Sequence, residues 1–568
     1  MGDRLYAGKA VPDGFFASLL DLKTFKPENI QGSGIFSRYE ADYENIIELF
    51  SSGKKIPRIT LQKSTKILKS VRPHVSDYYS ITASHFLHAG EIGIIHFYLL
   101  LQALISDINN ITVDEVNTVH ATILFKGHSK NKTLASSYRT ISSCPLIAKS
   151  LDIYLRDLNI ESWNQHQAPT QFLGQGSSHE LAALLLTELI QYSLNVHHQP
   201  LFILYLDAKS AFDNVLRQLL IRNLYFAGTK GEELLAINNR LAGRKTFAEW
   251  DKQIMGPIHD ELGVEQGGVN SGDFYKIYAK NQLQMAQSSR LGVKLSKDLI
   301  ISAIGQADDT VLVSNNLHSL QNLLQLSLFY CSKFNVQLCP SKTKLQVIST
   351  KRMTAAVSYL KEYSPVKLNG VTLKFFDTAE HVGIVRSVSG NLPNIMSRLT
   401  AHKKAVSAVL HTGSARHHRG NPAASLRLQQ VYGLPVLLSV LGSLVLNKAE
   451  KQTLSKHHQK TIQGLLRLYP NTPRAVYYFL AGCLPCEALI HLQQLSLLAM
   501  ITTLVGSPLH AHASTVFTTN TTSNSWFYQV RDICLQYNLP HPLTLLTPPC
   551  PFSKAGFKRL AKKHIIRY

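Results

Sequence analysis

The pattern of hydrophobic and polar positions separates a mixed front part of the chain from a helical back part. Helical apolar spacing marks residues 88–107, 145–157 and 178–195. Short apolar runs typical of strands cover residues 116–127, 201–206 and 299–315. From about Pro393 onward the periodicity is almost wholly helical. The pattern therefore predicts an α+β fold followed by an all-α region.

One predicted strand ends on a carboxylate. In the segment LFILYLDAKSAFDNV (residues 201–215), six apolar residues form a strand buried on both faces, and Asp207 follows it directly. Ser210 and Asp213 fit a capping box for a helix that begins at about Ala211, which leaves Asp207 free at the strand end. The alternative is that Asp207 is itself the helix cap.

A second pair of carboxylates lies between two further strands. In LIISAIGQADDTVLVSN (residues 299–315), two apolar strands meet around Asp308 and Asp309, as in a hairpin with acids at its tip. Carboxylate oxygens suit Mg²⁺, and two ions held about 3.5–4 Å apart can activate an attacking oxygen and stabilise a leaving one. Three carboxylates at two strand ends therefore indicate phosphoryl-transfer chemistry.

Composition and charge point to a polyanionic partner. The 568 residues are 45% hydrophobic and 17% charged, as in globular proteins, with a formal net charge of +22. Residues 386–568 hold 20 Lys and Arg but only three Asp and Glu, which is +17 of that total. This basic back part is expected to bind nucleic acid.

The cysteines and the apolar runs exclude some classes of protein. Seven cysteines are too few for a disulfide scaffold, which favours a reducing compartment. Cys483 and Cys486 have the spacing of half a zinc site without a matching second half, so two buried thiols are favoured over zinc. Residues 431–446 form the longest apolar run, too short to span a membrane, and are expected to be a buried helix.

Taken in order, the motifs resemble the reverse transcriptase of non-LTR (LINE-like) retrotransposons over roughly residues 75–400. LDAKSAFDNV and GQADDTVLVS resemble the two catalytic palm motifs, and GVEQGGVNSGDF (residues 263–274) resembles the Gln-Gly motif between them. ILFKGHSKNK, YRTISSCPLIAKSLD and QFLGQGSSHELA resemble the upstream fingers segments. NVQLCPSKTKLQV resembles the lysine-bearing motif, and FFDTAEHVGIV resembles the primer-grip hairpin.

The resemblance implies a right-hand polymerase fold of fingers, palm and thumb, with an all-α basic C-terminal extension. It implies an RNA-directed DNA polymerase that extends a DNA primer on an RNA template with deoxynucleotides (dNTPs). Asp207 and Asp308 would ligate two Mg²⁺ ions, with Asp309 as the supporting carboxylate and Mn²⁺ as an alternative ion. Lys126 and Arg139 would lie against the triphosphate, which Arg can bind bidentately.

Further roles follow for the nucleotide site. Phe212 occupies the steric-gate position, where its ring would exclude a ribose 2′-hydroxyl. Gln266 would contact the incoming nucleotide, and Gly267 would allow the backbone to approach it closely. Either Lys342 or Lys344 would protonate the departing pyrophosphate, and the sequence does not choose between them.

Two positions depart from the family pattern. Gln306 stands where the family usually has Tyr or Phe, which puts rate and fidelity in question. The Gln-Gly motif continues as Gly268-Val269-Asn270 and lacks the Asp-Pro that often follows. Neither departure replaces an expected metal ligand.

The predicted organisation has four parts: an N-terminal extension (1–75), fingers, palm and primer grip (76–400), thumb helices (401–450) and a helical basic extension (451–568). No endonuclease domain is recognisable, so the chain is expected to be a fragment of a longer polyprotein or a decayed copy. The alternative function is a catalytically inactive nucleic-acid-binding relic. An RNA-dependent RNA polymerase is disfavoured by Phe212 and Ala307. The resemblance implies a nuclear location and no membrane partner, and it leaves the oligomeric state and the template and target-site specificity open.

Overall fold

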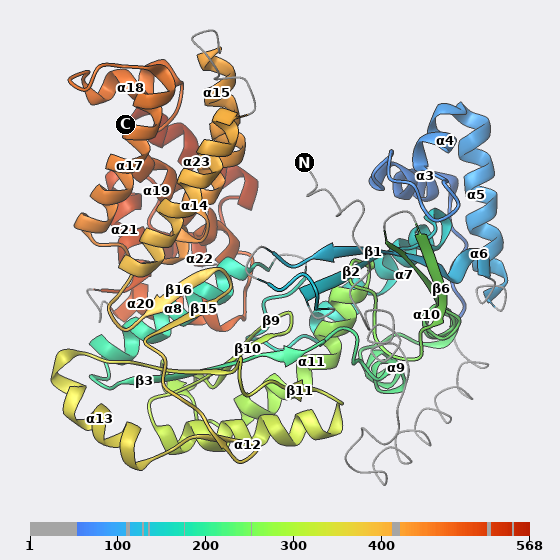
Figure 1. Ribbon diagram of the computed structural model, residues 1–568, viewed down its shortest axis with the longest axis horizontal. Coiled ribbons are helices and arrows are strands. Elements are labelled where there is room, and N and C mark those ends of the chain that lie inside the picture. Colours follow the sequence, from blue (N-terminus) through green and yellow to red (C-terminus); the bar gives the residue numbers. More distant parts are fainter. Residues whose placement is uncertain are drawn as a thin grey trace. The chain divides into compact units, whose positions relative to one another are not determined.

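The computed structural model describes nine stretches of the chain (Figure 1), which are residues 54–108, 114–127, 130–134, 137–174, 177–250, 253–411, 421–519, 524–547 and 550–568. These residues belong to two compact units. The first unit comprises Met1–Ala168, Ala208–Gln282 and Leu328–Leu338, and the second comprises Pro169–Asp207, Leu283–Ser327 and Cys339–Tyr568.

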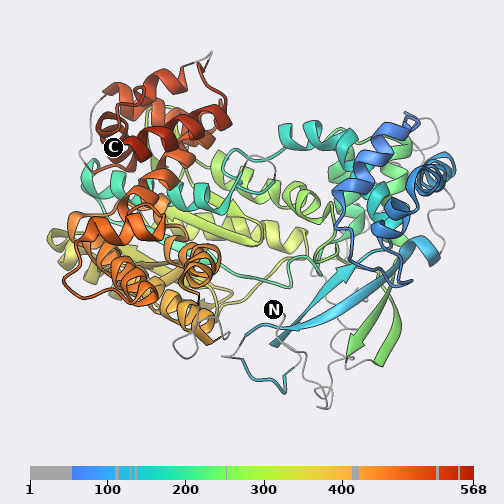
Figure 2. The same cartoon turned by 90° about the horizontal axis from the view of Figure 1, so that it is seen from above.

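The first unit is built on a four-stranded sheet in the order β2-β1-β5-β6. Its strands are β1 (Thr118–Phe125), β2 (Tyr138–Ser143), β5 (Lys245–Trp250) and β6 (Gln253–His259). β1 pairs antiparallel with β2 and parallel with β5, and the two hairpins are visible as blue and green arrows in Figure 2. Ile123, Tyr138 and Trp250 pack in a small apolar core on this sheet.

The first unit also contains helices. They are α3 (Leu61–Ser70), α4 (Ala83–His88), α5 (Gly90–Ser106), α6 (Asp114–Asn117), α7 (Leu146–Gln165), α9 (Arg217–Phe226), α10 (Gly231–Ala242) and the first part of α11 (Ser271–Ser288). The predicted helices at 88–107 and 145–157 are confirmed as α5 and α7. The predicted strand at 116–127 is confirmed as β1.

The second unit is built on an antiparallel sheet in the order β12-β3-β10-β9. Its strands are β3 (Leu201–Leu206), β9 (Ala303–Gln306), β10 (Asp309–Ser314) and β12 (Lys344–Ile348). All six residues of β3 are buried, because the strand is central and covered on both faces. The strand at 201–206 and the hairpin around Asp308 are thus confirmed, with Asp309 already on β10.

The predicted capping box after Asp207 is wrong. Ala208 and Lys209 form a short strand, β4, that pairs with β11 (Gln337–Leu338), and Ser210 then adopts a left-handed conformation with φ 49°. The helix begins only at Arg217, and its N-cap is Leu216, without a side-chain cap. Asp207 is therefore not a helix cap either.

Helix α8 (His179–Asn195), predicted at 178–195, lies in the second unit and is almost entirely buried. The buried Glu188 of α8 accepts hydrogen bonds from Ser525 Oγ and Trp526 N, both at 2.7 Å, at the start of α21 (Trp526–Gln536). His512 of α20 (Pro508–Thr519) lies 3.2 Å from the same carboxylate. The C-terminal helices thus share one apolar core with α8 and the strands of the β12-β3-β10-β9 sheet.

The remaining elements of the second unit are hairpins and helices. The hairpins are β7–β8 (Val293–Lys294, Ile300–Ile301), β13–β14 (Lys367–Leu368, Val371–Thr372) and β15–β16 (Thr378–His381, Ile384–Ser387). The helices are α12 (Leu317–Lys333, continuing into the first unit), α13 (Thr354–Tyr363), α14 (Leu392–His411), α15 (Pro422–Leu428), α16 (Leu434–Leu438), α17 (Lys448–Leu466), α18 (Arg474–Ala481), α19 (Cys486–Ile501), α20 (Pro508–Thr519), α21 (Trp526–Gln536), α22 (Pro542–Leu546) and α23 (Lys554–Arg567). This part confirms the predicted helical region.

The longest apolar segment and the cysteines can now be compared with the expectations from the sequence. Residues 431–446 are not one buried helix: a π-turn (Gln429–Gly433), α16 and a 3₁₀ turn (Leu441–Ser443) follow one another, with Val440 left-handed between the last two. Among the described residues no single helix is long and apolar enough to cross a bilayer. Helices α18 and α19 reach that length and apolar character only when they are taken together, and the chain bends by 60° between them. All seven cysteines are free thiols; Cys486 is buried and Cys483 is partly exposed.

Candidate active site

Strand pairing brings the carboxylates of the two acidic motifs together in the second unit. Leu206, the last residue of β3, pairs with Thr310 of β10, so the next residue, Asp207, lies beside Asp309. Asp309 in turn pairs with Gln306 across the β9–β10 turn, in which Ala307 is left-handed with φ 53°. The backbone carbonyl of Asp207 accepts a hydrogen bond from Cys339 N at 3.1 Å. Asp207, Asp308 and Asp309 therefore share one end of the sheet.

The carboxylates influence one another electrostatically. Partial burial, followed by the negative charges of Asp308, Asp207 and Glu380, raises the pKa of Asp309 to about 6. Like charges this close disfavour full ionisation unless a cation joins them. The site thus has the charge distribution that a divalent cation would stabilise.

The structure distinguishes between the two candidate lysines. Lys342 Nζ lies 3.1 Å from Asp207 Oδ2, with both side chains substantially exposed. Lys344, on β12, pairs with Tyr205 of β3, and its ammonium lies 5.9 Å from the ring centre of Phe376. Lys342, not Lys344, is therefore the lysine whose ammonium contacts one of the three carboxylates.

Glu380 is a fourth carboxylate near the site, and sequence reasoning missed it. It is exposed on β15 between the buried residues Ala379 and His381, and its charge contributes to the raised pKa of Asp309. The hairpin β15–β16 is attached to the palm sheet by the buried Gln346, whose amide donates to the carbonyls of Asp377 and Arg386. The strand alternation around Glu380 was the available signal, but it did not show which carboxylate the residue faces.

Gln346 also connects the hairpin to the strand that carries Asp207. Its Oε1 accepts a hydrogen bond at 3.0 Å from the hydroxyl of Tyr205, which is two residues before Asp207. Arg386, from the other strand of the hairpin, donates to Thr187 Oγ1 and to the carbonyl of Ala183 on α8. The primer-grip candidate β15–β16 is thus fixed to β12, β3 and α8 by hydrogen bonds of buried side chains.

The donor set suits Mg²⁺ in chemical type. Mg²⁺ prefers carboxylate oxygens and is usually held by one or two of them together with waters and substrate phosphates. Among the described residues, no three His, Cys, Asp or Glu are grouped so that they could hold a metal ion, so Asp207, Asp308 and Asp309 do not form a ready set of three ligands. Their carboxylate oxygens match the ligand type that Mg²⁺ prefers, and such an ion would draw its remaining ligands from water and phosphate.

The other predicted residues lie in the first unit, and the structure does not place them against the carboxylates. Phe212 is half-buried, and its ring stacks on Tyr275 with centroids 4.8 Å apart. Lys126 and Arg139 have exposed side chains on the β1–β2 hairpin. Because Arg139 pairs with Leu124, two residues before Lys126, the two cations lie on the same face of the hairpin.

The Gln-Gly segment lies in a tight loop of the first unit. Gln266 Nε2 donates to Asp213 Oδ2 at 3.1 Å, and the carbonyl of Gln266 accepts from Ser142 N at 2.9 Å. Gly267 has φ 105°, a conformation that favours glycine, and a Cβ there would lie 3.3 Å from Ser142 O. Asp213, predicted as part of a helix cap, instead binds the Gln266 amide.

Comparison with known proteins gives the site a family context. Residues 128–373, which contain all three carboxylates and both lysines, match the family model described as reverse transcriptase (RNA-dependent DNA polymerase). This segment is similar to reverse transcriptase domains. The predicted right-hand polymerase fold with a helical C-terminal region is confirmed. No curated protein matches the chain.

Three solved telomerase structures are similar to this chain. Apo telomerase from Candida tropicalis matches with 10% identity over 90% of this chain and 94% of that chain, with a TM-score of 0.39. A form truncated from the C-terminal domain matches over 48% of this chain and 54% of that chain, with 10% identity and a TM-score of 0.33. Candida albicans telomerase in complex with a fragment of telomeric RNA matches over 75% and 65%, with 11% identity and a TM-score of 0.32.

Proposed function

We propose that the protein is an RNA-directed DNA polymerase of the non-LTR retrotransposon type, which extends a DNA primer 3′-hydroxyl with dNTPs on an RNA template. The observation that carries the proposal is the convergence of Asp207, Asp308 and Asp309 at one end of the β3–β10–β9 sheet, inside the reverse transcriptase domain. The non-LTR assignment rests on the order of the sequence motifs along the chain and on the residues that make them up.

The three carboxylates would hold Mg²⁺, or Mn²⁺, between primer and nucleotide. A pair of such ions would supply charge stabilisation for the attacking and leaving oxygens of the in-line displacement. Lys342 would give a proton to the pyrophosphate; its ammonium lies beside Asp207 and is exposed to solvent, which supports this role. Proton transfer by a positioned side chain of this kind typically contributes about 10²–10⁴-fold to rate.

The first unit would supply nucleotide recognition. Lys126 and Arg139, on one face of the β1–β2 hairpin, would bind the triphosphate. Phe212 would act as the steric gate against ribose, held in place by the Tyr275 ring. Gln266 would contact the nucleotide, and Gly267 would keep the backbone free of side-chain bulk.

The remaining parts of the chain receive roles by the same proposal. Residues 76–400 would form the fingers, palm and primer grip, with 401–450 as the thumb and 451–568 as a basic extension along the template–primer. Template RNA, primer DNA and dNTPs would be the partners, with no membrane involved. The location would be nuclear, where the target-primed reaction of the family takes place.

A second candidate function is an inactive nucleic-acid-binding relic. Gln306 favours it, since this half-buried amide replaces the usual aromatic side chain and its Oε1 has no hydrogen-bond partner within the described part of the chain. Extension of oligo(dT) on poly(rA), with and without Mg²⁺, distinguishes the two functions. A polymerase gives Mg²⁺-dependent products, whereas a relic binds the template–primer and leaves the primer length unchanged.

A further inference from the structure

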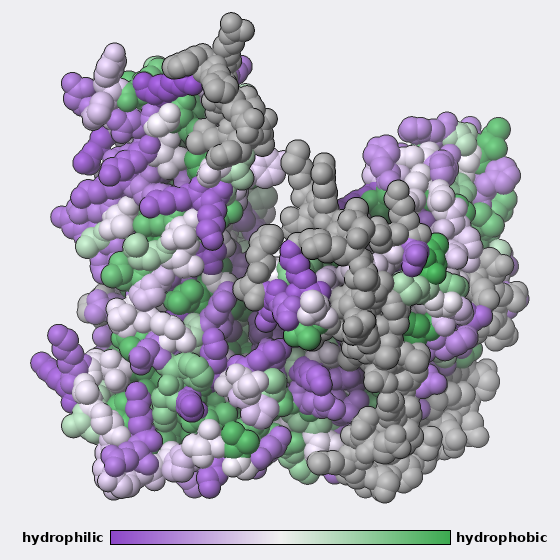
Figure 3. All heavy atoms as spheres, viewed as in Figure 1, coloured by the Kyte–Doolittle hydropathy of each residue, from purple (hydrophilic) through white to green (hydrophobic). Residues whose placement is uncertain are grey.

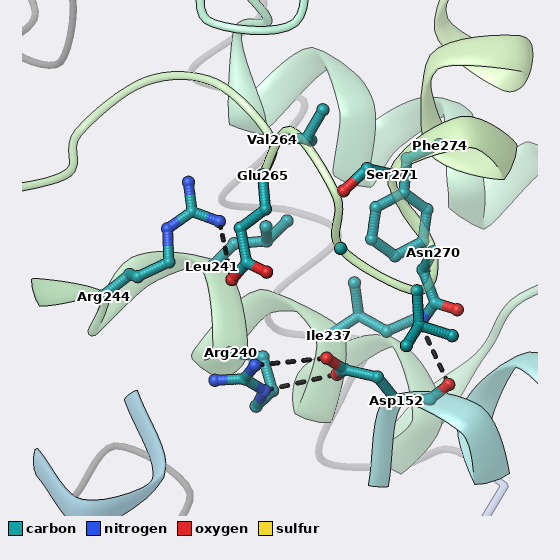
Figure 4. Close-up of a pocket in the computed structure, with 12 residues that line it drawn as sticks. Asp152, Ile237, Arg240, Leu241, Arg244, Val264, Glu265, Asn270, Ser271 and Phe274 are labelled. Atoms are coloured by element: carbon teal, nitrogen blue, oxygen red, sulfur yellow. Dashed lines mark hydrogen bonds and ion pairs between the residues drawn. The ribbon is translucent and has the colours of Figure 1, made fainter. Parts of the chain in front are cut away.

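A buried network of charges lies under the loop that carries Gln266 (Figure 4). At its centre is Arg244, whose side chain is 1% exposed. Arg244 Nε lies 2.8 Å from Asp260 Oδ2, and Arg244 Nη1 lies 3.2 Å from Glu265 Oε1. The second oxygen of Glu265 accepts a hydrogen bond from Cys144 Sγ at 2.7 Å. Burial, followed by the Glu265 charge, raises the pKa of the Cys144 thiol well above its usual value, so the thiol keeps its proton and donates it.

The network joins segments that are far apart in the chain. Arg244 follows α10, Cys144 follows β2, and Glu265 directly precedes Gln266. Ser142, at the end of β2, donates its backbone N–H to the Gln266 carbonyl at 2.9 Å. The end of β2 therefore holds the loop at two successive residues, Glu265 by its side chain and Gln266 by its backbone.

The loop has little room to move. A Cβ at Gly268 would lie 2.9 Å from Glu265 Oε2 and 2.6 Å from Ser271 Oγ. Backbone hydrogen bonds from Gly263 N to Val215 O and from Val264 N to Phe212 O, both 2.9 Å, fix the first half of the loop. The contacts of Glu265 thus hold the backbone from which the Gln266 side chain extends.

A second ion pair, between Arg240 and Asp152, lines a pocket that Arg244 and Glu265 also line (Figure 4). Arg240 contacts both oxygens of Asp152, at 3.3 and 3.2 Å, and the Asp152 carbonyl accepts from Asn270 Nδ2 at 3.1 Å. Buried ion pairs are seldom more stabilising than well-packed apolar residues, because both charges lose their hydration. Their better-attested effect is to specify one geometry, which here is the geometry of the loop from Glu265 to Asn270.

We infer that Glu265, held by Arg244 and Cys144, is a positioning residue that fixes Gln266 for nucleotide binding. Gln266 is held on its other side by Asp213, 3.1 Å from its amide nitrogen. The inference rests on the proposed function, since it takes Gln266 as a nucleotide contact. Loss of the Cys144 donor would let the Glu265 side chain turn, and Gln266 would lose its fixed orientation toward the nucleotide.

The test compares Cys144→Ala with Cys144→Ser in the full chain. The serine hydroxyl keeps a donor toward Glu265, and the alanine does not. In Mg²⁺-dependent primer extension, Cys144→Ala is expected to raise the KM for dNTP about tenfold, which is the effect of one lost hydrogen bond to a buried charge. Cys144→Ser should stay within about twofold of the parent, and kcat should change little in either variant.

Arg244→Lys is the second variant, because a lysine cannot contact Asp260 and Glu265 with the two arms of a guanidinium fork. It should raise the KM for dNTP in the same way without a matching change in the Kd for template–primer. An unchanged KM in both Cys144→Ala and Arg244→Lys would overturn the inference. A purely structural role is indicated instead if Ala and Ser at position 144 lower kcat and thermal stability equally.

Hydrogen exchange separates this inference from the proposed function. Amides of residues 263–268 should exchange faster in Cys144→Ala than in Cys144→Ser, whether or not the protein polymerises. If the parent protein extends no primer but this difference appears, the proposed function is wrong, while Cys144 and Glu265 still fix the loop. If exchange in the loop is the same in both variants, the inference that Cys144 and Glu265 fix the loop is wrong.

Discussion

Lys342 Nζ lies 3.1 Å from Asp207 Oδ2, and this pair links the lysine-bearing loop to the end of the central palm strand. The loop is held there by its backbone as well, because Cys339 N donates to the Asp207 carbonyl and Lys342 N donates to the Cys339 carbonyl, both at 3.1 Å. Lys342 therefore reaches the carboxylates from a fixed turn, while Lys344, two residues later, belongs to β12.

The first prediction concerns these two lysines. Lys342→Ala should lower kcat for primer extension by about 100-fold, within the range of general acid catalysis, because the pyrophosphate loses its proton donor. Lys344→Ala, the matched control, should lower it by less than about threefold, since its ammonium lies over the Phe376 ring. Single-turnover kinetics measures both. A larger loss in Lys344→Ala would reverse the assignment.

The second prediction follows from the pKa of Asp309, which is raised from 3.8 to about 6. Between pH 4 and 6 the folded protein binds the proton more tightly than the unfolded chain, so stability falls as pH rises through this window. In EDTA, the Tm of Asp309→Asn minus that of the parent should therefore increase from pH 4 to pH 6.5 and then level off. Asp298→Asn, an exposed acid in the β7–β8 turn, should show no such trend. A pH-independent difference would mean that the pKa of Asp309 is not raised in the folded protein.

The third prediction concerns sugar selection. Phe212→Val should raise ribonucleotide incorporation relative to deoxynucleotide, because the smaller side chain leaves room for a 2′-hydroxyl. It should also lower the free energy of unfolding by about 1–3 kcal/mol, since the stacking on Tyr275 is lost. Tyr275→Leu is the control that removes the stacking but keeps Phe212. Unchanged sugar preference in an active Phe212→Val variant would leave the ring with a packing role only.

The fourth prediction concerns the basic helices. Hydrophilic side chains crowd the outer surface of α17 and its neighbours (Figure 3). Lys403 and Lys404 of α14 and Lys456 and Lys460 of α17 are exposed. The helices meet where His402 Nδ1 lies 2.8 Å from His457 Nε2, and burial together with the charges of Lys403 and Lys460 lowers the pKa of His457. Arg416 and Arg419, in the same basic segment of sequence, lie outside the described residues.

Replacing the exposed lysines of α14 and α17 (Lys403, Lys404, Lys456 and Lys460) by Gln should weaken template–primer binding. It should also reduce the salt dependence of that binding. The slope of log affinity against log salt should fall by up to about 3.6, at about 0.9 per phosphate neutralised. The control replaces four cations outside the C-terminal helices, which are Lys294, Lys297, Lys351 and Arg352. Equal slopes for the parent and the helix variant would show that these lysines do not contact the nucleic acid.

Much of the sheet that carries the three carboxylates could be predicted, because short local sequence patterns identify its strands. The buried strand before Asp207 and the acidic hairpin at Asp308 follow from short patterns, and the strand pairing then brings them together. The prediction of a helix soon after Asp207 failed because of tertiary contacts. Strand β11 pairs with Ala208 and Lys209, and the Gln266 amide donates a hydrogen bond to the Asp213 carboxylate. A capping-box pattern carries no information about such distant partners.

The contacts of buried charges were equally out of reach of sequence reasoning. Glu265 and Arg244 are 21 residues apart, and Cys144 is 121 residues from Glu265. No periodicity relates them, because they meet only when α10, β2 and the Gln266 loop are packed. Glu380 was missed for the same reason, as its neighbour Asp309 lies on a different sheet of the same unit.

The central claim is that Asp207, Asp308 and Asp309 form a metal-dependent polymerase site, and it is tested most directly by Asp308→Asn against the control Asp298→Asn. Both variants remove one exposed carboxylate, but only the first lies at the end of the palm sheet. Primer extension on poly(rA)/oligo(dT) with Mg²⁺ should be abolished in Asp308→Asn and unchanged in Asp298→Asn, with equal template–primer binding in both. Extension by Asp308→Asn at the parental rate would contradict the assignment of the site.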